Sequence, residues 1–175
     1  MLESDRIIIK PLSHNELKLY LNEPDQSADQ MEVRLPDNPM SAELREAILK
    51  DLLPAIQSAG EDFIYYTLWL MISKSTRCIV GSFCFHGVPD CDGRVEIGYG
   101  TEPEYRRLGL MKEALGVIMS WIRNQQRIRM VTAETEPGNT GSIRTLMRCG
   151  FTNWQSNENS LVMKYEFSES GLSST

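Results

Sequence analysis

The stretch from Arg94 to Gly150 alternates between strand-like and helix-like patterns, and this alternation constrains the fold more than any other feature. Residues 94–100 alternate polar and apolar side chains, as a strand with one buried face does. Residues 111–124 carry apolar side chains at helical spacing, residues 128–134 return to a strand pattern, and residues 143–147 form a short helical stripe. The order strand, helix, strand, helix predicts an α/β domain.

The N-terminal part of the chain predicts one strand and two helices. The β-branched run over residues 6–10 favours a strand, and a capping box over Ser13–Glu16 predicts a helix that begins there. Residues 22–40 contain three prolines and many acidic side chains, so we expect a loop with short helical turns at most. Apolar residues at intervals of four then predict a helix over residues 41–60, with a bend at Pro54.

The middle and the end of the chain have the pattern of antiparallel strands. Residues 62–73 are apolar on both alternating faces, which predicts a strand covered on both sides. Residues 77–86 form its expected partner, with a bulge at Gly81. Two more strands are predicted over residues 151–154 and 161–167.

Length, composition and charge describe one globular domain. The chain has 175 residues, of which 41% are hydrophobic and 24% charged, and its formal net charge is −6. No linker or repeat divides it, so we expect one domain over residues 1–167 and a frayed polar tail over residues 168–175. The negative charge disfavours nucleic acid as a partner, and neither a membrane span nor a signal peptide is recognisable. We expect a cytoplasmic protein, either a monomer or a homodimer.

The cysteines and histidines predict no metal site. The four cysteines form no CxxC pair, and the sequence has only two histidines to help them. We therefore expect reduced thiols, some of them buried in strands. The cysteines are Cys78, Cys84, Cys91 and Cys149.

A signal for phosphate binding lies where the strand over residues 94–100 passes into the next helix. The main-chain amides of a first helical turn are unpaired, and the helix dipole adds positive charge there. Gly109 lets a ligand approach the backbone, and Arg106 and Arg107 offer charge-assisted hydrogen bonds to a diphosphate. Two arginines at a helix start are more often a solvated surface, so this pattern alone leaves both interpretations open.

Two longer runs of sequence resemble the GNAT acetyltransferase superfamily. IGYGTEPEYRRLGLMKEAL, Ile97–Leu115, resembles its acetyl-coenzyme A motif, Arg/Gln-x-x-Gly-x-Gly/Ala, with Met111 in place of the last small residue. NTGSIRTLMRCGF, Asn139–Phe151, resembles its later Asn-x-x-Ser helix that ends in Gly-Phe, and the ribosomal-protein N-terminal (RimJ/RimL-like) branch is the most similar. The resemblance implies a single domain with a mixed, strongly twisted sheet, flanked by helices and splayed between its fourth and fifth strands.

The resemblance also implies where acetyl-coenzyme A would bind. Main-chain groups of Tyr99, Gly100 and Thr101 would bond the pantetheine arm as a neighbouring strand does. Asn139 and Ser142 would face the coenzyme. The diphosphate would lie against the helix start, at Arg106, Arg107, Leu108, Gly109, Leu110 and Met111.

Acetyl transfer to an amine needs a proton acceptor and a stabilised oxyanion. An ammonium with a pKa of about 10.4 gives its proton poorly to a carboxylate with a reference pKa of about 4.3, so either the base is perturbed or water relays the proton. Glu96 is the candidate base, because it lies on the glycine-bearing face and the superfamily's histone acetyltransferases carry their catalytic glutamate at this strand position. A structural carboxylate is the alternative. The resemblance implies a main-chain N–H near Tyr99 as the oxyanion donor.

The group that protonates the leaving thiolate is open. Many superfamily members place a tyrosine four residues before the glycine of the Gly-Phe pair, where this chain has Leu146. Ser142, a tyrosine from elsewhere such as Tyr165, and water remain as candidates. Cys149 is expected to be a packing residue rather than a nucleophile, and His86 a loop or core residue rather than a base.

We expect an N-acetyltransferase that moves the acetyl group from acetyl-coenzyme A to a primary amine by direct transfer. The acceptor is a protein N-terminus, as the RimJ/RimL-like resemblance implies, or a small-molecule amine. If the acidic residues 23–37 line the acceptor site, they favour a cationic amine. The alternative is a non-catalytic acyl-coenzyme A sensor or partner-binding module that has kept the fold.

Overall fold

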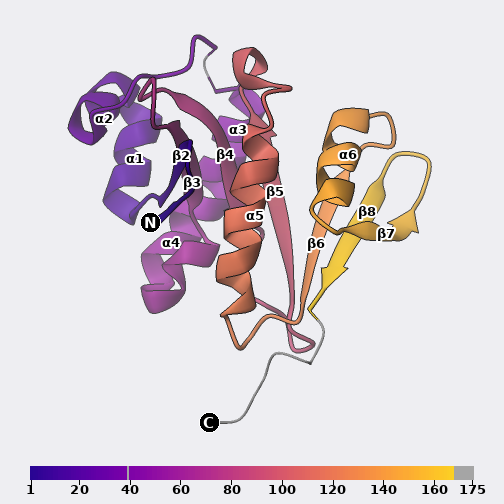
Figure 1. Ribbon diagram of the computed structural model, residues 1–175. Coiled ribbons are helices and arrows are strands. Elements are labelled where there is room, and N and C mark those ends of the chain that lie inside the picture. Colours follow the sequence, from indigo (N-terminus) through magenta and orange to yellow (C-terminus); the bar gives the residue numbers. More distant parts are fainter. Residues whose placement is uncertain (39, 168–175) are drawn as a thin grey trace.

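One mixed sheet organises the computed structural model, which describes residues 1–38 and 40–167 (Figure 1). The strands lie in the order β1-β2-β3-β4-β5-β6-β8-β7, and only β5 and β6 run parallel. The strands are β1 (Leu2–Glu3), β2 (Ile7–Pro11), β3 (Leu68–Ser73), β4 (Ile79–Phe85), β5 (Arg94–Thr101), β6 (Met130–Thr135), β7 (Thr152–Ser156) and β8 (Leu161–Glu166). The α-helices are α1 (His14–Asn22), α2 (Pro24–Met31), α3 (Ala42–Ala47), α4 (Leu53–Ser58), α5 (Leu110–Arg123) and α6 (Thr140–Arg148).

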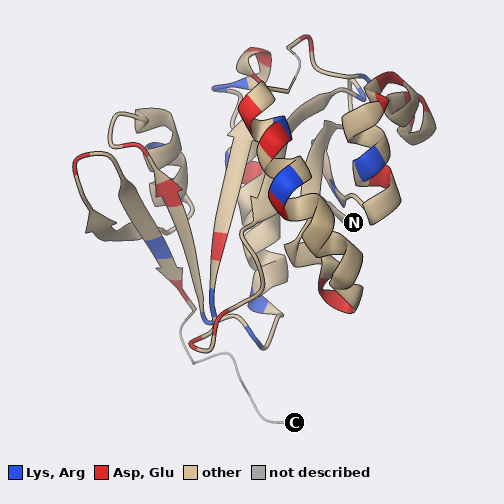
Figure 2. Ribbon diagram, turned by 180° about the vertical axis from the view of Figure 1, so that it is seen from behind, with Lys and Arg blue, Asp and Glu red and all other residues tan. Residues whose placement is uncertain are grey.

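Helices cover the two faces of the sheet unequally. Trp69 and Met71 of β3 pack in the core beneath α5 and α6, whereas Leu68, Leu70 and Ile72 pack against α1–α4 on the other face. This confirms that the strand is covered on both sides. Seen from behind, the segment from α3 to α4 crosses the sheet, but no described helix lies behind β5, β6 and β8 (Figure 2). That face is open where the candidate base lies.

The sheet opens between β5 and β6. Their parallel pairing joins Arg94–Ile97 to Met130–Ala133, and Gly98–Thr101 pair only with β4. The far end of β6 pairs instead with β8, so the two strands diverge, with α5 and α6 on either side (Figure 1). The predicted splay between the fourth and fifth predicted strands is confirmed. The numbers rise by one because Leu2–Glu3 adds a short edge strand.

The local signals of the N-terminal helices hold in detail. Ser13 Oγ accepts from the Glu16 amide at 3.3 Å, and the Glu16 carboxylate accepts from the Ser13 amide at 2.8 Å, which completes the capping box. The predicted bend takes the form of a π-helical turn, Ile48–Leu52, in which the Leu53 amide bonds to Ile48 O. The wider turn directly precedes Pro54, which has no N–H to continue a regular ladder.

Two predictions of secondary structure were wrong. The loop expected over residues 22–40 contains the helix α2, because Pro24 stands in its first turn, where a missing N–H costs no helical bond. Residues expected to begin a long strand form a 3₁₀ helix, Gly60–Tyr65, and β3 starts only at Leu68. The Tyr65 ring packs edge-on against Phe85 at 5.1 Å. Its aromatic character reflects core packing rather than strand pairing.

The predicted stripe on α6 is also only partly correct. Leu146 is fully buried, but Met147 is 60% exposed. The stripe is therefore narrower than the sequence suggested, because α6 lies at the margin of the sheet. The predicted polar tail, residues 168–175, lies outside the described residues.

Candidate active site

The loop between β5 and α5 presents a row of free main-chain amides. Gly109 adopts a left-handed conformation with φ of 76° and precedes the first residue of α5. In the described part of the chain, the amides from Arg107 to Met111 donate no hydrogen bond. Arg107 also has a positive φ of 64°, a conformation that costs about 1–2 kcal/mol outside glycine. Strain of this kind is typical of loops shaped for a ligand, and such a row of amides suits an anion.

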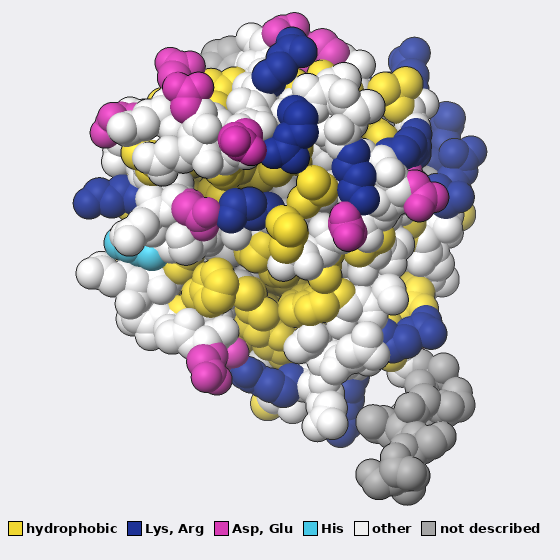
Figure 3. Space-filling model, turned by 60° about the vertical axis from the view of Figure 1, so that its left-hand side comes forward, with side chains coloured by type: hydrophobic (Ala, Val, Ile, Leu, Met, Phe, Trp, Pro, Cys, Tyr) yellow, Lys and Arg dark blue, Asp and Glu magenta, His cyan; other side chains and the backbone are white. Residues whose placement is uncertain are grey.

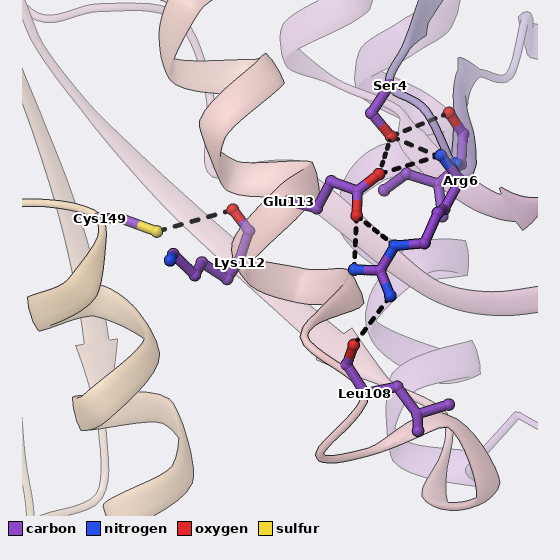
Figure 4. A network of polar contacts seen from close by, with 7 residues as sticks. Ser4, Arg6, Leu108, Lys112, Glu113 and Cys149 are labelled. Carbon is purple, nitrogen blue, oxygen red and sulfur yellow. Dashed lines mark hydrogen bonds and ion pairs between the residues drawn. The ribbon is translucent and has the colours of Figure 1, made fainter.

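A polar network fixes this loop to the N-terminal strand pair (Figure 4). Arg6 Nη1 donates to Leu108 O at 3.1 Å, and Arg6 Nε donates to Glu113 Oε2 at 2.6 Å. Glu113 also accepts from the Ser4 hydroxyl at 2.5 Å and from the Arg6 amide at 3.0 Å. Partial burial opposes ionisation of Glu113, but these donors together lower its pKa. Sequence inspection missed Arg6, which lies far from the motif along the chain.

The two motif arginines differ in position. Arg106 Nε donates to Thr101 O at 3.2 Å and so ties the loop to the end of β5. Arg107 is exposed at the outer side of the loop. Both arginines are exposed in the loop before α5, and the Arg106 guanidinium already donates one hydrogen bond to the backbone.

The free edge of β5 is set by the alternation of its hydrogen bonds. The His86 amide bonds to Glu96 O, and the Glu102 amide bonds to Val80 O, each at 3.0 Å. Because bonding alternates along an antiparallel strand, the even-numbered residues between them face β4. The main-chain groups of Tyr99 and Thr101 therefore face the split. Gly100, predicted with them, directs its main-chain groups to β4.

The predicted residues of α6 lie across the split from β5. Asn139 Oδ1 accepts from the Ser142 amide at 3.1 Å and caps the helix. The hydroxyls of Tyr99 and Ser142 lie 2.8 Å apart. Burial raises the pKa of Tyr99 to about 12, against a lowering by Ser142, so the phenol stays neutral. The structure thus brings together Tyr99, Asn139 and Ser142 at the mouth between the two strands.

Glu96 lies on the opposite, helix-free face of β5. Its Oε1 is 2.8 Å from Nδ1 of His86 at the end of β4, and both side chains are about half exposed, at 40% and 52%. His86 stands in an exposed bend directly after β4, in agreement with the loop position expected from the sequence, but its contact with Glu96 was not expected. The strand register brings the pair together, and no local sequence signal shows it.

The remaining candidates for the group that protonates the leaving thiolate lie in different places. Leu146 is buried in the core, so the position of the missing tyrosine does not reach the split. The Tyr165 hydroxyl accepts from Arg123 Nη2 at 3.2 Å. Burial raises the pKa of Cys149, against a lowering by Lys112, which disfavours a thiolate nucleophile. Ser142, next to the Tyr99 hydroxyl, is the candidate that faces the split.

A cavity of about 290 Å³ lies near the end of α1. A smaller cavity of about 40 Å³ shares Tyr20, Pro36 and Met40 with it and reaches β4 and Glu102. Burial and the neighbouring Glu104 raise the pKa of Glu102, while Arg106 opposes the shift. Of the predicted acidic segment, Asp37 lines the larger cavity. No separate sequence signal marks this cavity.

Two kinds of feature are absent from the described residues. No helix there is long and apolar enough to cross a membrane. Residues 1–38 and 40–167 contain no group of three or more His, Cys, Asp or Glu side chains able to hold a metal ion. On the side of α1, α2 and α4, acidic and basic side chains intermingle around an exposed apolar area (Figure 3).

Comparisons with known proteins agree with this geometry. Residues 6–152 match the family described as acetyltransferase (GNAT) domain. The chain is 36% identical over 83 residues to YjdG, an uncharacterized N-acetyltransferase of Bacillus subtilis strain 168, a match that covers 47% of this chain and 49% of the relative. It therefore matches about half the length of that relative.

Solved structures share the fold at low identity. The ribosomal-protein-S5-alanine acetyltransferase of Vibrio fischeri superposes with a TM-score of 0.66 at 15% identity, over 95% of this chain and 96% of that one. RimL, a ribosomal alpha-N-protein acetyltransferase in complex with coenzyme A, superposes with a TM-score of 0.64 at 15% identity, over 93% and 95%. The family match covers most of the chain, and this chain belongs to the GNAT family of acetyltransferases.

Proposed function

We propose that the protein transfers an acetyl group from acetyl-coenzyme A to a primary amine by direct attack. The observation that carries this proposal is the free edge of β5 leading into the row of unpaired amides at Arg107–Met111. A peptide-like arm satisfies the edge groups, and a diphosphate satisfies the amides. Open space around Gly109, where the nearest atom to an added Cβ is Arg6 Nη2 at 3.7 Å, leaves room for the phosphates.

The residues along the split match successive parts of the coenzyme, from the diphosphate to the thioester. The amides of Arg107–Met111 and the charge of Arg106 would hold the diphosphate, and main-chain groups of Thr101 and Tyr99 would hold the arm, with Asn139 and Ser142 facing it from α6. Acetyl-coenzyme A would supply a thioester, and the Tyr99 amide would stabilise negative charge on its carbonyl oxygen. The neutral hydroxyls of Tyr99 and Ser142 would donate hydrogen bonds to the leaving sulfur.

The amine approaches from the helix-free face, where Glu96 drives its deprotonation. This face is open in the structure, and the cavity beside Tyr20 and Glu102 adjoins it. A carboxylate there attracts the arriving amine in its cationic form. It then stabilises the positive charge on the group that takes the proton. Met111 fits the site because its main-chain amide, not its side chain, contributes.

We propose a protein N-terminus as the acceptor. The similar structures named above act on ribosomal proteins. Asp37 lines the larger of the two neighbouring cavities and Glu102 the smaller one, and negative charge at either would favour a cationic acceptor. Replacement of the usual tyrosine by Leu146 supports a second candidate, a coenzyme A sensor without turnover.

A screen of acceptors separates these candidates. The protein is mixed with acetyl-coenzyme A and, in separate wells, peptides with free N-termini, lysine side-chain analogues and small amines, and free thiol is measured. We expect thiol release and an acetylated product with N-terminal peptides. Binding of coenzyme A without thiol release in any well contradicts the enzyme and supports the sensor.

A further inference from the structure

His86 and Glu96 are held opposite each other by the sheet itself. The His86 amide bonds to Glu96 O at 3.0 Å, so the two residues form a directly facing pair on β4 and β5. Facing residues project their side chains to the same side of a sheet. Here that side is the helix-free face, and the side chains meet at 2.8 Å between Nδ1 and Oε1.

The contact leaves the other ring nitrogen of His86 available. A carboxylate only accepts hydrogen bonds, so Nδ1 donates to Glu96, and in the neutral imidazole the lone pair is on Nε2. Nε2 lies over Gly98, where an added Cβ would stand 2.9 Å from it. In the described residues Nε2 has no hydrogen-bond partner, and the imidazole is half exposed. The next residue, Tyr99, carries the amide that faces the split.

We propose that Nε2 of His86 takes the proton from the acceptor amine, with Glu96 as the positioning residue that holds Nδ1–H. The proposal rests on the acetyl transfer proposed above and names its proton acceptor. One N–H bond of the ammonium breaks and its proton goes to Nε2. The freed nitrogen lone pair forms the bond to the thioester carbonyl carbon, and the C–S bond breaks as the second N–H proton of the adduct passes to the departing sulfur, which leaves as the free thiol. The imidazolium then releases its proton to water.

General chemistry favours an imidazole over a carboxylate in this role. Reference pKa values of about 6.5 for imidazole and about 4.3 for a glutamate carboxyl place the imidazole about two units closer to an amine. A protein N-terminus, with a reference pKa of about 7.7–8.0, is closer still. An imidazole thus suits an N-terminal acceptor better than a lysine side chain.

The side chains around His86 and Glu96 leave the proposed proton transfer undisturbed. Cys84 lies beside His86 at Gly98, and burial raises the pKa of its thiol to about 11, so it stays neutral. Arg94, on the same face of β5, pairs with Asp90 at 3.0 Å. On the neighbouring strand β6, the register places the buried Thr132 beside Glu96. Glu96 is therefore the charged group in contact with the imidazole among the described residues.

The decisive variant is His86→Asn. Its amide nitrogen takes the place of Nδ1 against Glu96, but it has no atom at the position of Nε2. We expect kcat/KM on an N-terminal peptide to fall by roughly 10²- to 10⁴-fold. The variant's remaining activity should rise about tenfold per pH unit as free amine forms, because nothing else accepts the proton. His14→Asn, the same change at the other histidine, should match wild type.

The outcomes separate the two proposals. Folding and coenzyme binding of His86→Asn are checked by an unchanged rise in melting temperature with coenzyme A. Wild-type kcat/KM in His86→Asn at every pH, with activity lost in Glu96→Gln, would show Glu96 as the direct acceptor and overturn this inference while acetyl transfer stands. Absence of transfer by the wild-type protein to any amine would overturn the proposed function itself.

Discussion

At the residue scale, Glu96 combines a predictable position with an unpredicted partner. Its place on the glycine-bearing face follows from alternation along Arg94–Thr101. Its contact with His86 follows from the register of β4 against β5. A carboxylate held against an imidazole keeps one ring tautomer and stabilises the imidazolium. We therefore expect Glu96 to act through the imidazole of His86, a role that does not require burial of its carboxylate.

Replacing Glu96 with Gln should lower turnover and leave coenzyme binding intact. Gln preserves shape but removes the negative charge and presents an amide in place of a pure acceptor. We expect a loss of roughly 10²- to 10⁴-fold in kcat/KM near neutral pH. Raising the pH should recover part of the activity, because free amine then needs no acceptor. The pH profiles of both proteins on one peptide test this, and identical profiles would make Glu96 structural.

At the element scale, the start of α5 depends on a glycine in the left-handed region. A side chain at Gly109 strains a backbone with φ of 76° and fills the space above the free amides. The same helix contains Gly116, which is exposed and has open space where a side chain would go. The two glycines form a matched pair for substitution.

Gly109→Val should abolish the rise in melting temperature that coenzyme A produces, and Gly116→Val should keep it. With coenzyme A at 100 times its dissociation constant, wild type should gain about 2.7 kcal/mol. For a domain of this size each kcal/mol raises the melting temperature by roughly 2–4 °C. Thermal denaturation with and without the ligand gives the values. An equal shift in both variants would remove the diphosphate from this loop.

The tether between the N-terminal strands and α5 should depend on pH. The pKa of Glu113 is lowered in the folded protein, so its stabilisation is present above the unfolded value of about 4.3 and is lost as the pH falls through the lower folded value. Glu113→Gln should reduce the free energy of unfolding by about 1.5–3 kcal/mol at pH 7. Urea unfolding at pH 7 and near pH 3.5 measures the difference. A difference that stays constant would assign the effect to packing instead of charge.

At the scale of the whole molecule, the split in the sheet leaves main-chain groups of β5 free along one edge. Parallel pairing stops after Ile97, and the core beneath α5 and α6 keeps the two halves of the sheet together. The main-chain groups of Tyr99 and the amide of Thr101 are left free at this edge, while Thr101 O accepts from Arg106 Nε. We expect the coenzyme arm to bond these free groups as a neighbouring strand would.

Hydrogen exchange should show this edge directly. The amides of Tyr99 and Thr101 face the split and should exchange faster than those of Gly98 and Gly100, which face β4. Coenzyme A should slow the first two and leave the second two nearly unchanged. Residue-resolved exchange by NMR makes the comparison within one strand. Equal protection of all four amides by the ligand would place the arm elsewhere.

Elements whose signals are local could be predicted from the amino-acid sequence alone. The capping box at Ser13–Glu16, the helix of residues 111–124 and the glycine before it act through neighbours a few residues apart, so their pattern is visible without the fold. The two GNAT-like runs also predicted coenzyme-binding residues, and these lie on β5, at the start of α5 and on α6. Errors arose at α2 and at Gly60–Tyr65, where tertiary packing outweighed local propensity.

Only the tertiary structure decided which distant residues meet. Arg6 reaches Leu108, His86 faces Glu96 and Tyr99 meets Ser142 because strand order, register and helix packing bring them together. None of these contacts has a periodic signature, since side-chain alternation defines a face but not the residue opposite on the next strand. The loop between β5 and α5, which we propose holds the diphosphate, was visible in the sequence. Its contact with Arg6 and the pairing of Glu96 with His86 were not.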